Sequence, residues 1–178
     1  DGDSTEIIEF FAPPAAGLND SISRPNAVPG NVRGLYALQA RYGQLKWSQL
    51  LSPAEGFARF GHQISRALAR DLRLAGPALF TDPELRKIFL TGAGVPVSEG
   101  DLVRQLELGA VLSQLRVRGA GDFYAGSTAK QLVAGISSAK GALTKVELRA
   151  YSPVWKDSVS IPFGPHTLHT APPPVAGG

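Results

Sequence analysis

Apolar residues recur every three or four positions through the middle of the chain, a pattern that predicts successive amphipathic helices. The first helix is expected to open at Pro29-Gly30-Asn31 and to end before Gly43, which is placed for a left-handed C-cap. Further helices are predicted over residues 47–51, 53–60, 65–74, 83–89, 102–117 and 123–138.

Several helix boundaries carry recognisable residues. Gly76-Pro77 is expected to end the helix before it, and Asp82 with Pro83 forms an N-cap and first-turn pair. The spacing of Thr144 and Glu147 is a capping box, in which the hydroxyl accepts from the third amide and the carboxylate reaches back. A short helix is therefore expected to follow Thr144.

The two ends of the chain differ from this helical middle. Residues 1–29 are rich in Pro, Ala, Asn and Ser and are expected to be extended and irregular, with one short strand at Glu6–Phe11. Residues 30–151 form the predicted helical region. Residues 152–178 are β-prone around the turn at 162–165, which predicts a short hairpin that ends in a PPPVAGG loop. The fold class is mainly α with a small β element.

Composition narrows the classes of function. The 178 residues carry a formal net charge of +3, and the basic residues are scattered without interleaved aromatics, so no nucleic-acid surface is expected. No apolar run is long enough to span a membrane, and no cysteine is present for disulfides or thiolate metal sites. A chain that begins at Asp1 and contains no methionine is expected to be a fragment or a processed product.

The residues that could carry chemistry form no catalytic or metal-binding pattern. His166 and His169 are spaced by three, so they would lie on opposite faces of a strand, and His62 is remote in sequence. No carboxylate accompanies them, and no G-x-S-x-G elbow is present. Gly92-Ala93-Gly94 lacks the rest of a phosphate-binding loop. We therefore predict no catalytic residue, no metal and no cofactor from these patterns.

A set of ordered motifs is nevertheless specific. The run Asp122-Phe123-Tyr124-Ala125-Gly126 is followed by Gly141-Ala142-Leu143-Thr144, then by Leu148-x-Ala150-Tyr151 and by Pro172 to Gly178. Upstream, Val28-Pro29-Gly30 precedes Gly34-Leu35. In this order and at these intervals, the motifs resemble the large subunit of the gamma-glutamyltransferases, also called gamma-glutamyltranspeptidases.

This resemblance implies a fold and a reaction. The family comprises N-terminal-nucleophile hydrolases of αββα architecture that cleave themselves into a large and a small subunit. The new N-terminal Thr of the small subunit attacks the gamma-glutamyl amide of substrates such as glutathione, with its own amine as base. By resemblance, this chain is the helical portion of the large subunit, inactive alone, with the small subunit as partner. The bacterial relatives imply a periplasmic or extracellular location, and the uncovered apolar faces imply self-association.

Two departures from the family pattern bear on the substrate. The family's R-E-x-A-P motif supplies an Arg that grips the α-carboxylate of the gamma-glutamyl group. Aligned on Ala12-Pro13, this chain has Glu9 in the place of that Arg and Phe10 in the place of the Glu, while Arg24 is the nearest arginine in sequence. A carboxylate at Glu9 would repel the substrate carboxylate that an Arg would bind. Val175-Ala176 replaces two serines of the final loop.

Glu9 is thus the candidate substrate-binding residue, unless the alignment slips within this loop. Three readings of the function remain open. The first is a fragment of a divergent enzyme, which acts on gamma-glutamyl compounds or on a different amide. The second is a non-catalytic relative that serves as a binding or structural module. The third is an unrelated helical interaction domain.

Overall fold

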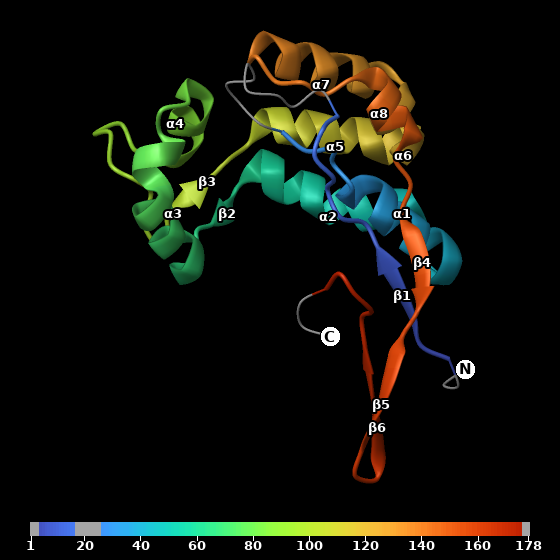
Figure 1. The fold of residues 1–178 in the computed structure, drawn as a ribbon. Coiled ribbons are helices and arrows are strands. Elements are labelled where there is room, and N and C mark those ends of the chain that lie inside the picture. The colour runs from blue at the N-terminus through green and yellow to red at the C-terminus, as the bar shows by residue number, and fades with distance from the viewer. Residues whose placement is uncertain (1–3, 17–25, 176–178) are drawn as a thin grey trace. The chain divides into compact units, whose positions relative to one another are not determined.

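The computed structural model describes residues 4–16 and 26–175, of which about half are helical. Figure 1 shows the elements of the chain coloured by residue number. The chain forms two compact units. Unit 1 contains residues 1–44 and 120–178, and unit 2 contains residues 45–119. The division into residues 1–29, 30–151 and 152–178 follows sequence order and stays a prediction.

Unit 1 holds four strands and four helices among the described residues. Its elements are β1 (Glu6–Glu9), α1 (Asn31–Tyr42), α6 (Ala120–Ala125), α7 (Ser127–Ser138), α8 (Lys145–Ala150), β4 (Val154–Asp157), β5 (Val159–Phe163) and β6 (His166–Thr170). Strand β1 pairs antiparallel with β4, so that Glu9 lies opposite Val154. Strands β5 and β6 form a hairpin with Phe163 opposite His166.

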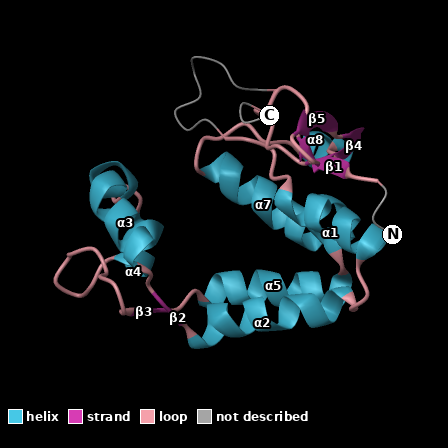
Figure 2. Cartoon of the chain, turned by 90° about the horizontal axis from the view of Figure 1, so that it is seen from below, coloured by secondary structure: helices cyan, strands magenta, loops and turns pink. Residues whose placement is uncertain are grey.

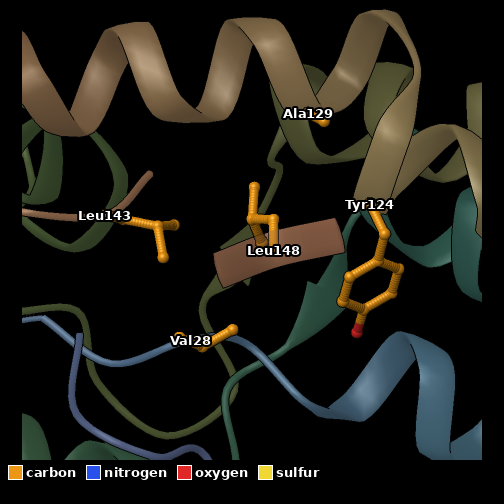
Figure 3. Packing of buried hydrophobic residues seen from close by; sticks show 5 residues of the cluster. All are labelled: Val28, Tyr124, Ala129, Leu143 and Leu148. Carbon is orange, nitrogen blue, oxygen red and sulfur yellow. The ribbon is translucent and has the colours of Figure 1, made fainter. Parts of the chain in front are cut away.

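The core of unit 1 brings together segments that are distant in sequence. Figure 3 shows the buried side chains of this cluster, which are Val28, Tyr124, Ala129, Leu143 and Leu148. Tyr124 and Leu148 are 1% and 0% exposed. Full burial of a side chain such as that of Leu148 stabilises the fold by about 1.5–3 kcal/mol relative to exposure. The core therefore joins the stretch before α1 to α6, α7 and α8.

Unit 2 is built on two long helices and a smaller cluster. Its elements are α2 (Trp47–Phe60), β2 (His62–Gln63), α3 (Arg66–Leu79), α4 (Pro83–Phe89), β3 (Leu102–Val103) and α5 (Leu106–Arg118). Helices α2 and α5 lie side by side (Figure 2). A Cβ atom at Gly109 of α5 would lie 2.7 Å from Cγ of Arg59, so a glycine permits this close approach. A second core, around Ile64, Leu72 and Val103, lies between β2, β3 and α3.

The helix N-caps predicted at Asp82 and Thr144 are confirmed. The carboxylate of Asp82 accepts a hydrogen bond from the amide of Glu84 at 2.9 Å, and α4 begins at Pro83. The hydroxyl of Thr144 accepts from the amide of Glu147 at 3.2 Å, and the carboxylate of Glu147 accepts from the amide of Thr144 at 2.8 Å. These bonds satisfy first-turn amides that have no partner inside the helix.

Two predicted helix breaks are wrong. Residues 47–51 and 53–60 form a single helix, α2, that contains Pro53. Helix α3 continues through Gly76-Pro77 to Leu79 instead of ending there. In both helices one face packs in the interior, and that packing outweighs the hydrogen bond that an internal proline removes.

The cap conformation predicted at Gly43 and the helix bounds predicted at Leu102 and Gly126 also need correction. Gly43 has φ −75° and ψ 136°, which is extended and not left-handed. Leu102–Val103 pairs with β2, so α5 begins only at Leu106. The long helix expected over residues 123–138 is divided into α6 and α7 at Gly126. Val154 and Trp155, predicted as part of the hairpin, pair instead with β1.

Candidate functional site

Glu9 lies at the end of β1 with its side chain only 10% exposed. One carboxylate oxygen, Oε2, lies 2.6 Å from Nζ of Lys156 in β4. The other oxygen, Oε1, is buried and has no hydrogen-bond partner among the described residues. The Lys156 ammonium is also 3.5 Å from the carbonyl oxygen of Pro173. Glu9 is thus a nearly buried charge that one lysine neutralises.

A pocket of about 440 Å³ adjoins this ion pair. It is lined by Ile7, Ile8, Glu9, Phe10, Phe11, Ala12, Asn31, Ala171 and Val175. Glu9, Phe10 and Val175, the three described positions where the chain departs from the family pattern, therefore line the same pocket. Ala176 and Arg24 lie outside the described residues. The walls are mostly apolar, and Glu9 is the one ionisable residue among the lining residues.

Two glycines leave space for the segment that follows Glu9. A Cβ atom at Gly30 would lie 2.4 Å from the carbonyl oxygen of Phe10, and one at Gly34 would lie 2.2 Å from Cγ of Phe10. Both distances are far below van der Waals contact. The V-P-G-x-x-x-G-L motif therefore brings the first turn of α1 against Phe10, and the tyrosine hydroxyl of Tyr151 donates to the carbonyl oxygen of Phe11 at 2.9 Å.

Tyr124 and Arg33 hold the start of α1 against the core. The Tyr124 hydroxyl donates to the carbonyl oxygen of Pro29 at 2.8 Å and accepts from the amide of Arg33 at 3.0 Å. The Arg33 guanidinium lies 4.0 Å from the centre of the Tyr124 ring and donates to the carbonyl oxygens of Arg149 and Tyr151. Burial raises the pKa of Tyr124, which keeps the hydroxyl protonated and able to donate.

Asp122 caps α7 across Gly126. Its carboxylate accepts from the amides of Ser127 at 3.0 Å and Thr128 at 3.1 Å, and from the Thr128 hydroxyl at 2.5 Å. The Thr128 hydroxyl is the largest of the causes that lower the pKa of Asp122 to about 2. A Cβ atom at Gly126 would lie 2.1 Å from Oδ1 of Asp122, so this cap requires glycine there. The D-x-Y-x-G core of the motif is architectural, since each of its residues supports the fold.

Replacing Asp122 with alanine is expected to lower the free energy of unfolding by about 1–2 kcal/mol, because two amides and the buried Thr128 lose their acceptor. A carboxyl whose pKa is lowered on folding contributes stability above its unfolded value of 3.8, and that contribution is lost as the pH falls toward about 2. Urea denaturation of both proteins at pH 7 and at pH 2.5 measures this. The difference between them should shrink at the lower pH, and an unchanged difference would show that the charge is irrelevant.

The histidines do not gather into a site. The Nδ1 atom of His169 lies 3.1 Å from the hydroxyl of Ser158 and 3.2 Å from that of Ser160, on the hairpin. His62 pairs with Val103 in unit 2. Among residues 4–16 and 26–175, no three His, Asp or Glu side chains are placed to hold a metal ion. Within the same residues, no helix combines the length and apolarity needed to cross a membrane.

Lys156 is the site residue that the sequence alone did not indicate. Glu9 lies opposite Val154, and Lys156 is two residues along β4, so Glu9 and Lys156 are diagonal neighbours on one face of the β1–β4 pair. The sequence could indicate Lys156 as a neighbour of Glu9 only once β4 was known to pair with β1. Glu9 stays a predicted substrate-binding residue, and Lys156 joins it as a structural neighbour.

The family model for gamma-glutamyltranspeptidase matches residues 13–178. The chain is 35% identical over 153 residues to Scoloptoxin SSD14 of Scolopendra dehaani, which covers 85% of this chain and 26% of that protein. It is 33% identical over 151 residues to the glutathione hydrolase proenzyme of Pseudomonas aeruginosa, which covers 85% of this chain and 26% of that protein.

The crystal structure of Helicobacter pylori gamma-glutamyltranspeptidase shares the fold, with a TM-score of 0.85 and 24% identity over 99% of this chain and 58% of that chain. The chain spans about a quarter of the length of these two curated relatives. Glu9 lies just before the first residue matched by the family model, whereas the glycine, tyrosine and aspartate motifs lie within it. The chain belongs to the gamma-glutamyltranspeptidase family.

Proposed function

We propose that this chain is the helical portion of the large subunit of an N-terminal-nucleophile enzyme that transfers or hydrolyses gamma-glutamyl amides. In this proposal, glutathione-type amides are the substrates of the intact protein. The threonine nucleophile belongs to the small subunit, and the present chain alone is inactive. The match to the family over residues 13–178 carries the proposal. Family members named glutathione hydrolase proenzyme support the two-subunit arrangement.

The distribution of apolar surface supports a small-subunit partner. In unit 1, Leu35 and Leu38 of α1 are 50% and 40% exposed, and Phe163 of the hairpin is 73% exposed. Apolar side chains on helices and hairpin strands usually face a covering layer. A sheet supplied by the rest of the protein would cover them. The isolated chain should use the same faces for self-association.

The ion pair at Glu9 favours a second candidate, an enzyme that acts on an amide without the α-carboxylate. A substrate carboxylate placed at this position would meet the carboxylate of Glu9 instead of a guanidinium. Lys156 is occupied by Glu9 and by the carbonyl oxygen of Pro173. In this second candidate the nucleophile and reaction of the family are kept, but the enzyme accepts an acyl group that lacks the α-carboxylate.

Two chromogenic substrates distinguish these candidates in the full-length protein. We expect two bands on a denaturing gel and release of p-nitroaniline from the gamma-glutamyl or the 4-aminobutanoyl amide, the latter lacking the α-carboxylate. The 178-residue chain should release none. If Glu9 excludes the carboxylate, the charge swap Glu9→Arg with Lys156→Glu should shift the ratio of kcat/KM toward the gamma-glutamyl substrate by about 10- to 100-fold.

The swap keeps an opposite-charge pair between β1 and β4, so the fold is retained while the charge at the pocket is reversed. An unchanged ratio would show that Glu9 does not contact the acyl group. A single uncleaved chain that releases no p-nitroaniline from either substrate would contradict both enzymatic proposals and leave the non-catalytic module.

A further inference from the structure

A second pocket, of about 360 Å³, lies between α2 and α5 in unit 2. It is lined by Ser52, Glu55, Gly56, Arg59, Phe60, Ser113 and Arg116. The motifs that define the family do not involve these residues. The pocket therefore has a composition that the proposed amide chemistry does not explain.

Glu55 organises two arginines at this pocket. Its side chain is 12% exposed, and its two oxygens lie 2.9 Å from Nε of Arg59 and 2.7 Å from Nε of Arg116. The hydrogen bond from Arg116 is the first of the causes that lower the pKa of Glu55, so the carboxyl is ionised at neutral pH. Ser113 also lowers the pKa of Glu55 and so favours the charged form. The carboxylate thus fixes both guanidiniums in place.

The arrangement leaves donors and positive charge available. An arginine has five N–H donors, and the shortest contacts of Arg59 and Arg116 with Glu55 are made by Nε. The hydrogen bond from Arg116 to Glu55 is likewise donated by Nε, at 2.7 Å. Two guanidiniums and one carboxylate leave a net charge of +1 at the pocket. A pair that served only to join the helices would be expected to use the bidentate fork, which is the stronger geometry.

The pocket has hydroxyl and apolar parts as well. Ser52 lies one helical turn before Gly56 on α2 and is exposed, so its hydroxyl is available to a bound group. A Cβ atom at Gly56 would have no neighbour within 4 Å, which shows that the space beside this turn is open. Phe60 is 76% exposed and provides an apolar wall at the end of α2.

We propose that this pocket binds a small doubly charged oxyanion of the phosphate class, with Arg59 and Arg116 as its charged donors and Ser52 as a hydroxyl donor. Guanidiniums recognise such groups through paired N–H bonds, and pre-orientation by Glu55 reduces the entropy lost on binding. The proposal concerns unit 2 and is independent of the proposed amide chemistry.

Titration of the 178-residue chain with inorganic phosphate tests this site, with the ionic strength held constant by sodium chloride. Chemical-shift changes in the backbone amide spectrum should localise to α2 and α5 and should saturate. Arg116→Gln is expected to weaken binding at least tenfold. Gly56→Leu should abolish binding because it fills the pocket and leaves every charge in place, and leucine is favoured over glycine within a helix.

Arg66→Gln is the matched control, since it removes one positive charge from an exposed position of unit 2. Its affinity for phosphate should equal that of the unchanged chain. Equal weakening by Arg66→Gln and Arg116→Gln would show a general charge effect and overturn the proposal. Undiminished binding by Gly56→Leu, or no saturable shift in the unchanged chain, would overturn it as well.

Discussion

Replacing Lys156 with methionine is expected to lower the free energy of unfolding by about 3 kcal/mol. The carboxylate of Glu9 is 10% exposed and its second oxygen has no partner among the described residues, so Lys156 is the cation that compensates its burial. Removing one member of a buried pair leaves an uncompensated charge, which costs far more than losing a surface ion pair. Urea denaturation followed by tryptophan fluorescence measures the change, since Trp155 adjoins the mutated position.

The double variant Glu9→Gln with Lys156→Met should recover most of this loss, because no buried charge then remains. Lys130→Met is the control for removing an exposed lysine from unit 1, and it should change stability by less than about 0.5 kcal/mol. If Lys156→Met and Lys130→Met had the same effect, the pair with Glu9 would be no more than a surface contact.

The parts of the fold that could be predicted from the sequence are those specified by neighbouring residues. The N-cap at Asp82 and the capping box at Thr144 require an acceptor side chain two or three residues before the amides that it binds. Such signals do not depend on the rest of the molecule. The hairpin of β5 and β6 was predicted for the same reason, since its turn and both of its strands are contiguous.

The helix boundaries that were predicted wrongly are those where tertiary packing competes with the preference of nearby residues to end a helix. Pro53 lies inside α2, and Gly76-Pro77 lies inside α3, although both would disfavour an isolated helix. The break at Gly126 has the opposite origin. Apolar spacing continues through it, but the carboxylate of Asp122 captures the amides of Ser127 and Thr128 and starts a new helix. The spacing of apolar residues alone does not show that a side chain will bind these two amides and interrupt the helix.

Glu9 stays a predicted substrate-binding residue. Comparison with the family motif singled out Glu9, yet the pairing of β1 with β4 spans about 150 residues of sequence and has no local signature. Lys156 could therefore not be assigned as its neighbour. The motif glycines were recognisable as family markers, but their physical role became clear only through the position of Phe10.

Because Gly34 leaves space for Phe10, replacing this glycine is the second change with a large expected effect on stability. Replacing Gly34 with alanine is expected to destabilise unit 1 by about 2–3 kcal/mol, although alanine is favoured over glycine within a helix by about 1 kcal/mol. The added Cβ would lie 2.2 Å from Cγ and 2.6 Å from Cβ of Phe10. Rotation about χ1 moves Cγ but not Cβ of Phe10, so a rotamer change cannot remove the contact with Cβ. The backbone beside Glu9 must shift, or α1 must separate from it.

Gly135→Ala in α7 is the matched control, because a Cβ atom there has no neighbour within 4 Å. It should stabilise the chain by about 0.5–1 kcal/mol, so the same chemical change has opposite signs at two helical positions of unit 1. Urea denaturation gives both values, and hydrogen exchange at Phe10 and Phe11 reports the local effect. Gly34→Ala should speed that exchange while Gly135→Ala leaves it unchanged. Stabilisation by Gly34→Ala would mean that Phe10 does not pack on α1, and the pocket beside Glu9 would lose its physical basis.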